Sequence, residues 1–271
     1  MGIDIDLAES VVSSDYFSEV LEPQPIDLER LKKVLIIAPH QDDEAIGCGG
    51  LLSELSQRGV EITLVFVTDG RPISENPQAE IKIRSEESHT VAEILNANII
   101  ELGINNVSME IDAAHVARLA DICDNNWSGI FTTWVLDRPY KHRIINYLLL
   151  KAMKRLDSST QVFCYQVHST LIPNVIFDYT ALIEKKQKLI NVYQSQLKSQ
   201  SYQHLSQGLD AWNSRFLPRS GKPSYAECYT QLPLIAFREL VALYDKNPKQ
   251  TFHSSEDCLK AYNNLKTESS K

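Results

Sequence analysis

The stretch VLIIAPHQDDEAIGCGG, residues 34–50, decides the fold that this sequence predicts. Its first five residues are apolar and largely β-branched, which is typical of a short strand buried on both faces. Pro39 ends that strand, and one imidazole and three carboxylates follow it, at positions 40, 42, 43 and 44. Because open α/β sheets carry their sites beyond the carboxyl ends of parallel strands, we expect a site at this edge.

Strand patterns and helix patterns alternate along the rest of the chain. Apolar runs predict further strands at residues 60–68, 98–104, 127–134 and 161–168, and amphipathic patterns predict helices at 49–59, 81–96, 110–125 and 142–156. Helices between parallel strands give right-handed crossovers. We therefore predict a Rossmann-like α/β fold, with a mostly parallel sheet of at least five strands and helices on both faces. Asp69 follows the second strand, either as a turn residue or as outer support for the site.

The chain divides into three parts on its composition. Residues 1–30 are acidic and carry Pro23 and Pro25 before the first strand, so we expect an N-terminal arm packed on the surface. Residues 31–231 hold the alternating pattern and form the predicted main domain. Residues 232–271 predict one added helix, LIAFRELVALYDK, and then a polar, disordered tail.

Composition limits the classes of function. The 271 residues are 43% hydrophobic, enough for a large core, and the net charge of −8 argues against a nucleic-acid partner. No apolar run approaches the roughly 20 residues that span a bilayer, and the N-terminus lacks a signal-peptide pattern. The five cysteines lack CxxC spacing, which favours reduced thiols in a cytoplasmic protein. A small-molecule or glycan substrate fits these features, and the sequence allows an oligomer.

The polar cluster after the first strand has two interpretations. Adjacent buried carboxylates repel one another and are costly to bury, and a divalent cation is the simplest way to offset this. Nitrogen and carboxylate ligands together suit zinc better than calcium or magnesium. The other interpretation is a solvated loop that caps a helix. The buried strand before the cluster and the glycines after it favour the metal site.

The stretch APHQDDEAIGCGG resembles the signature of the LmbE/PIG-L family of zinc-dependent N-deacetylases, in which H-x-D-D-E precedes a glycine-rich turn. The resemblance implies that His40 and Asp43 bind zinc. It also implies that Asp42 is the general base.

Two later segments extend the resemblance. TTWVLDRPYKHR, residues 132–143, is similar to the family pattern W-x-x-D-x-H-x-D-H, which implies that His142 is the third zinc ligand and that Asp137 belongs to the substrate site. The family also carries an R-x-x-E pattern that matches Arg84 and Glu87. It implies that Arg84 contacts the substrate or supports the site, whereas the spacing alone would also fit an ion pair within one helix.

The second motif departs from the family pattern at two positions. Pro139 replaces its first histidine, and Lys141 replaces its aspartate. The missing histidine is implied to stabilise the oxyanion or to protonate the leaving amine, and losing one such donor typically costs about 10²–10³ in rate. Lys141 is our first candidate for a replacement, although a solvated surface lysine is the alternative. Arg138, Tyr140 and His168 are further candidates that the sequence does not separate.

The sequence therefore predicts a zinc-dependent hydrolase that removes an N-acetyl group from an amino-sugar-containing substrate. In this hypothesis Asp42 and Lys141 are catalytic, while Arg84 and Asp137 bind substrate. An alternative hypothesis is a catalytically impaired family member that binds sugar and keeps its metal. A magnesium-dependent phosphatase is a third possibility, but it would leave His40 and His142 unexplained.

Overall fold

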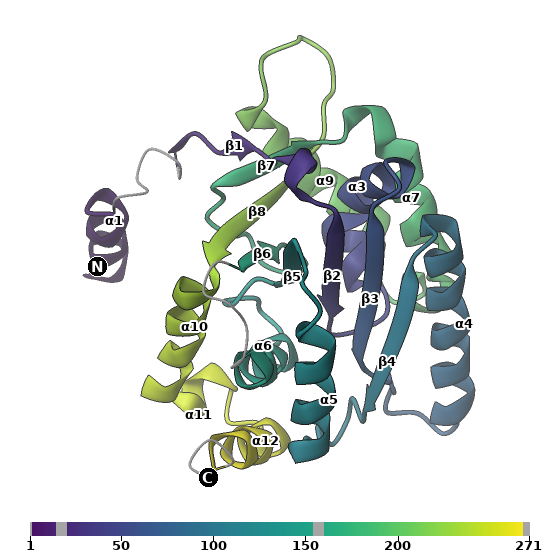
Figure 1. Cartoon of the computed structure of the whole chain (residues 1–271), viewed down its shortest axis with the longest axis vertical. Helices are drawn as coiled ribbons and strands as arrows, with labels where there is room; N and C mark the ends of the chain where they lie inside the picture. The colour runs from purple at the N-terminus through teal and green to yellow at the C-terminus, as the bar shows by residue number, and fades with distance from the viewer. Residues whose placement is uncertain (1, 15–20, 154–159, 268–271) are drawn as a thin grey trace.

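A computed structural model of the chain describes residues 2–14, 21–153 and 160–267. Within these residues one sheet of eight strands runs through the molecule, in the order β1-β7-β8-β6-β5-β2-β3-β4 (Figure 1). The strands are β1 (Gln24–Pro25), β2 (Lys33–Ala38), β3 (Glu61–Thr68), β4 (Asn98–Ile104), β5 (Gly129–Thr133), β6 (Gln161–Tyr165), β7 (Val175–Asp178) and β8 (Ala226–Pro233).

The predicted Rossmann-like arrangement is confirmed. The neighbours β4, β3, β2, β5 and β6 are all parallel, with β2 in the centre between β3 and β5. The chain moves outward from β2 to β3 and β4, and it then returns to the other side of β2 at β5. The adjacent ends of β2 and β5 are therefore the point where the strand order reverses, which is where such sheets bind their ligands. Strand β8 runs antiparallel between β6 and β7.

Helices cover both faces of the sheet because the strand residues alternate between two cores. Val34, Ile36 and Ala38 of β2 belong to one core, and Leu35 and Ile37 belong to the other. The first core packs against α3 (Asp43–Gln57), α4 (Pro77–Leu95) and α7 (Ile183–Val192), with α8 (Gln194–Leu197) and α9 (Tyr202–Asn213) beside them. The second packs against α5 (Ala113–Cys123), α6 (Tyr140–Ala152), α10 (Leu234–Ala242) and α12 (Glu256–Thr267). This explains why the predicted first strand is apolar throughout.

The remaining elements are short or peripheral. They are α1 (Gly2–Val12), α11 (Pro248–Thr251) and 3₁₀ turns at Leu28–Arg30, Thr180–Leu182, Ser214–Phe216 and Leu243–Lys246. Part of the predicted N-terminal arm joins the sheet, since Gln24 and Pro25 of β1 pair with Val175 and Ile176 of β7. The domain boundaries at 30/31 and 231/232 stay predictions.

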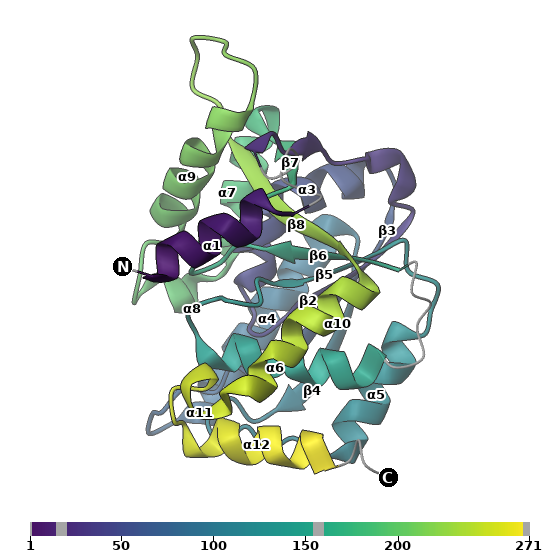
Figure 2. The same cartoon turned by 90° about the vertical axis from the view of Figure 1, so that its left-hand side faces the viewer.

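The C-terminal segment differs from the expected polar tail, and that part of the prediction is wrong. After α10 the chain forms a second long helix, α12, which lies against α6 (Figure 2). Its buried residues Cys258, Ala261, Tyr262 and Leu265 recur at helical spacing. Polar residues between them lower the average hydrophobicity of the segment, so its narrow apolar stripe was not recognised in the sequence. Residues 268–271, where disorder was expected, lie outside the described residues.

Candidate metal centre

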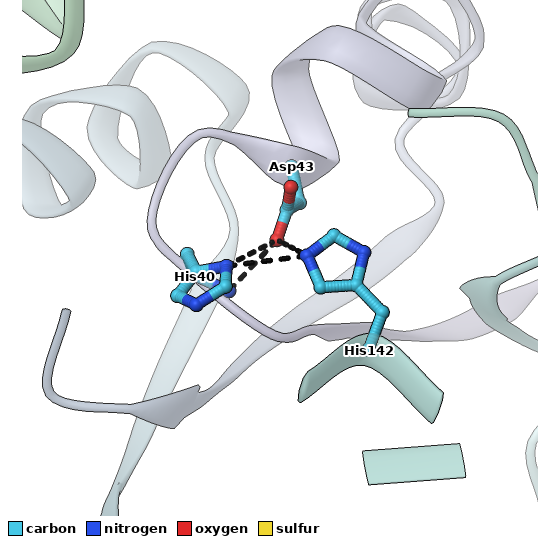
Figure 3. Close-up of side chains that lie close together, drawn as sticks. All are labelled: His40, Asp43 and His142. Atoms are coloured by element: carbon cyan, nitrogen blue, oxygen red, sulfur yellow. Dashed lines mark hydrogen bonds and ion pairs between the residues drawn. The ribbon is translucent and has the colours of Figure 1, made fainter. Parts of the chain in front are cut away.

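The loops after β2 and β5 bring the predicted ligands together. His40 comes from the turn between β2 and α3, Asp43 is the first residue of α3, and His142 comes from the first turn of α6, which follows β5. Asp43 Oδ2 lies 3.2 Å from His40 Nδ1 and 3.5 Å from His142 Nε2, and these two nitrogens are 3.3 Å apart (Figure 3). The ligand atoms of the three residues all lie within 4.8 Å of one another. The geometry therefore matches the predicted ligand set.

Each imidazole has a second partner on its outer side. His142 Nδ1 lies 2.8 Å from Asp137 Oδ2, and His40 Nε2 lies 2.9 Å from Asn106 Oδ1. When the outer nitrogens donate their hydrogens to these oxygens, the inner nitrogens carry lone pairs. Two lone pairs and a carboxylate oxygen then face one another, an arrangement that a cation stabilises.

Burial and charge set the protonation of the ligands. Burial opposes the charge of Asp43, but His142 and His40 outweigh it and hold the Asp43 pKa below its usual range. Burial also opposes the charge on His142, yet the carboxylates of Asp43 and Asp137 raise its pKa. For His40, burial dominates and lowers the pKa. Asp43 is thus an anion in this cluster, as a metal ligand must be.

Asp42 is buried beside the ligands in an unusual backbone conformation. Its φ of 142° lies in a region that residues other than glycine rarely adopt, and such strain is concentrated at functional sites. The side chain is 10% exposed, and its Oδ1 lies 3.5 Å from Arg84 Nη2. Burial raises the pKa of Asp42 well above its usual range, Asp43 adds to this effect and Arg84 opposes it.

Arg84 lies behind Asp42 and is not paired with Glu87. The guanidinium donates to the main-chain oxygens of Gln41, at 2.9 Å, and Gly70, at 3.2 Å. Glu87 instead accepts from the main-chain N–H of Ser195, at 2.8 Å, and from its hydroxyl. The contacts described for Arg84 thus support the site, and its contact with substrate stays a prediction.

The placement of Asp137 differs from the predicted role in substrate binding. The residue is fully buried behind His142. Its second oxygen accepts from the main-chain N–H groups of Arg138, at 3.0 Å, and His168, at 3.2 Å. The contacts described for this carboxylate orient His142, and a contact with substrate stays a prediction.

The two positions that depart from the family motif lie on the same helix. Pro139 is the N-cap residue of α6, where it offers no hydrogen-bond donor. Lys141 directs its ammonium group to the main-chain oxygen of Asn106. Among the other candidates, His168 has its ring centre 5.5 Å from that of His142.

Asn106 was missed because it belongs to no recognised motif. It follows β4, which is separated from β2 by β3 in the sheet. Its side chain nevertheless contacts His40, which follows β2. Its position directly after a predicted strand was the available signal, since the ends of parallel strands share one edge. Asp69, which has two interpretations in the sequence, supports Asn106 by accepting its main-chain N–H at 3.0 Å.

No helix in the described part of the chain is long and apolar enough to cross a membrane.

Comparison with known proteins agrees with this site. Residues 35–153 match the family PIG-L, GlcNAc-PI de-N-acetylase, and this segment contains His40, Asp43 and His142. The chain is 38% identical over 74 residues to diacetylchitobiose deacetylase of Thermococcus kodakarensis, which is 26% of this chain and 28% of that protein. The match thus spans little more than a quarter of that relative.

Solved structures of similar fold include proteins of more than one activity. N,N'-diacetylchitobiose deacetylase from Pyrococcus horikoshii aligns with a TM-score of 0.66 at 24% identity, over 78% of this chain and 89% of that one. GalB, the 4-carboxy-2-hydroxymuconate hydratase of Pseudomonas putida KT2440, aligns with a TM-score of 0.64 at 19% identity, over 74% and 96%. Likeness at this level shows the fold, and fold alone does not determine function. Residues 35–153, somewhat less than half of the chain, thus match the PIG-L, or LmbE-like, family, and the fold of the described residues is similar to that of solved deacetylases.

Proposed function

We propose that this protein is a zinc-dependent hydrolase that removes the acetyl group from an N-acetylated amino sugar. The observation that carries the proposal is the convergence of His40 Nδ1, Asp43 Oδ2 and His142 Nε2 beside the buried carboxylate of Asp42. Three ligands of this type are common at catalytic zinc sites, where a further position is left for water or substrate.

The donor set fits a zinc ion. Two imidazoles and one carboxylate match the ligands that zinc prefers, whereas calcium and magnesium prefer oxygen ligands. Both imidazoles are oriented from outside by hydrogen bonds, as metal-binding histidines usually are. A zinc ion held there would polarise an amide carbonyl and lower the pKa of a water molecule.

Asp42 is the proposed general base. Its raised pKa lets it hold a proton nearer neutral pH than an exposed aspartate does. It can accept a proton as water attacks the amide carbon and give that proton to the nitrogen of the leaving amine. Arg84, 3.5 Å away, keeps the carboxylate in place and limits the rise of its pKa.

Lys141 stays our prediction for a donor to the carbonyl oxygen, in place of the histidine that Pro139 replaces. In the structure its ammonium group binds the main-chain oxygen of Asn106. Acting on substrate would require Lys141 to leave this contact. His168 is the alternative donor that the structure brings beside His142.

The substrate class and cellular location rest on the family and on the thiols. The family is described as GlcNAc-PI de-N-acetylase, and the relative in T. kodakarensis is a diacetylchitobiose deacetylase. We therefore propose a glycan or sugar conjugate that carries N-acetylglucosamine. All five cysteines are buried and free, which supports the predicted cytoplasmic location.

A second candidate function is supported by Pro139. Its ring removes both a side-chain donor and the main-chain N–H at the position of the motif histidine. A protein that binds metal and sugar but hydrolyses slowly or not at all would retain the ligands and lose this donor.

Mass spectrometry of N-acetylglucosamine derivatives incubated with the zinc-loaded protein separates the two functions. We expect the wild type to release one acetyl group per turnover. Asp42→Asn should abolish release while zinc stays bound, and Asp121→Asn, an exposed carboxylate on α5, should behave as the wild type. If the wild type is inactive and Pro139→His is active, the second function, a protein that binds metal and sugar without hydrolysis, would be supported instead.

A further inference from the structure

Asn106 lies where the loops after β3 and β4 meet the first turn of α6. Its side-chain Oδ1 is 2.9 Å from His40 Nε2 and 3.4 Å from Lys141 Nζ. Its side-chain Nδ2 donates to the main-chain oxygen of Arg71 at 2.9 Å. Its main-chain N–H donates to Asp69, and its main-chain oxygen accepts from Lys141. Every polar atom of Asn106 thus has a partner.

These partners determine how the amide is oriented. The carbonyl oxygen of Arg71 can only accept a hydrogen bond, so the amide nitrogen must face it. The ammonium group of Lys141 can only donate, so the amide oxygen faces that side. Because this oxygen also faces His40 Nε2, that nitrogen carries the hydrogen whenever a metal ion, in place of a hydrogen, occupies the side of Nδ1, which faces Asp43 Oδ2 at 3.2 Å. Nδ1 of His40 then carries the lone pair that points to Asp43 and His142.

We propose that Asn106 is a positioning residue that holds His40 in the tautomer whose Nδ1 binds the metal. This inference rests on the proposed metal site and does not depend on the reaction that the site catalyses. Asp137 has the same relation to His142, at 2.8 Å. Outer partners of this kind orient the ligand ring and set its basicity. A neutral amide serves His40 and a carboxylate serves His142, so His40 is the less basic of the two ligands.

Lys141 completes the arrangement by holding Asn106. Its side chain is partly buried, and its ammonium group donates to the main-chain oxygen of Asn106. The family motif has an aspartate at this position. A carboxylate here would face the two oxygens of Asn106 and repel both. Lysine at position 141 therefore matches asparagine at position 106, and it joins the loop after β4 to α6.

The test measures zinc affinity by competition with a chromophoric chelator, in the absence of substrate. Asn106→Leu keeps the size of the side chain and removes its hydrogen bonds, and it should raise the Kd for zinc about 10–100-fold. Lys141→Met acts one contact further out and should raise the Kd by about three- to tenfold. Lys141→Arg retains the donor and should restore most of the affinity.

Asn174→Leu is the matched control. Asn174 is also half-buried, and its amide bonds to the main chain of Gln231, with Nδ2 donating at 2.9 Å and Oδ1 accepting at 2.7 Å. The substitution removes hydrogen bonds of the same kind without touching His40. We expect it to lower stability as Asn106→Leu does and to leave the Kd for zinc unchanged.

A second measurement reads the tautomer directly. Nitrogen-15 NMR of the zinc-loaded wild type should show hydrogen on Nε2 of His40 and none on Nδ1, with the two nitrogens assigned from their couplings to the ring protons. Hydrogen on Nδ1 instead, or a folded Asn106→Leu protein that binds zinc within twofold of the wild type, would overturn the inference. If Asn106→Leu does not fold, the position of the hydrogen on His40 in the wild type tests the inference by itself. A wild type that binds zinc but hydrolyses nothing would count against the proposed function alone.

Discussion

Asp42 and Asp43 are chemically identical neighbours whose pKa values shift in opposite directions. Burial raises the pKa of both side chains, but His142 and His40 lie close enough to Asp43 to reverse the effect there. At Asp42, Arg84 at 3.5 Å opposes burial without outweighing it, so Asp42 keeps a higher proton affinity. Environments that move two carboxylates apart in pKa commonly separate an anionic role from a proton-transfer role.

This difference predicts distinct effects on zinc content. Replacing His40, Asp43 or His142 by Ala should remove most of the zinc, because each supplies one of three converging ligand atoms. Asp42→Asn should leave the zinc bound. Inductively coupled plasma mass spectrometry of the purified proteins measures the content per chain. Full zinc content in His142→Ala would show that the third ligand is assigned wrongly.

The site was predictable from sequence where its residues lie close together in the chain. His40, Asp42 and Asp43 follow one strand, and a second motif carries His142. Asn106 was not predictable in this way, because its contact with His40 exists only when β4 lies beside β3 and β3 beside β2. The orientation of Lys141 depends on the same contact, so sequence alone left it between a catalytic and a surface residue.

Helix α3, which begins at Asp43, packs closely against the segment after β7. A Cβ atom on Gly50 would lie 2.5 Å from Cγ and 2.7 Å from Cβ of Tyr179, which is fully buried. Because neither atom is at the flexible end of a side chain, the helix or the neighbouring chain would have to move. Glycine at this position thus sets how near α3 lies to the segment that follows β7.

Gly50→Ala should therefore lower the free energy of unfolding by about 1–3 kcal/mol, as overpacking in a core does. Gly208→Ala on α9 is the control, because a Cβ atom there meets nothing within 4 Å. Alanine at that position should stabilise the helix by about 0.5–1 kcal/mol. Urea unfolding followed by circular dichroism measures both. Equal effects of the two substitutions would contradict the close packing of α3.

Elements with strong local patterns were predicted, and those that depend on distant partners were not. Residues 34–38 of β2 are apolar and residues 49–57 of α3 have an amphipathic pattern, so both elements were expected, but α3 begins at Asp43, six residues before the predicted start. β7 has only four residues, and β8 ends in the partly exposed sequence TQLP, so neither resembles a buried strand until they pair with each other.

A buried ion cluster joins the distant parts of the molecule. Lys186 of α7 lies 2.7 Å from Asp210 of α9 and 2.8 Å from Glu227 of β8. Glu227 also accepts from the main-chain N–H groups of Gly50 and Leu51 in α3, both at 2.8 Å. Two carboxylates share one lysine, so the fully ionised cluster would carry an excess negative charge. Burial and the proximity of Glu227 accordingly raise the pKa of Asp210 to about 6, against the opposing effect of Lys186.

The raised pKa predicts a dependence of stability on pH. The folded protein binds a proton at Asp210 more tightly than the unfolded chain does, so this contribution is present at pH 4 and is lost as the pH rises through about 6. Between pH 4 and 7 the free energy of unfolding of the wild type should fall by roughly 1–3 kcal/mol relative to Asp210→Asn. Urea titrations at each pH measure this, with Asp121→Asn as the exposed control. A constant difference between wild type and Asp210→Asn would exclude the effect.

The contact between Glu227 and α3 bears on the order of events during protein synthesis. A ribosome that has made residues 1–153 has already made His40, Asp43 and His142, as well as all of α3. The carboxylate that binds the middle of α3 belongs to β8, which is translated after α9. We therefore expect the nascent chain to carry the residues of the proposed metal site before α3 is fully held by β8, a stage at which such intermediates are vulnerable to aggregation.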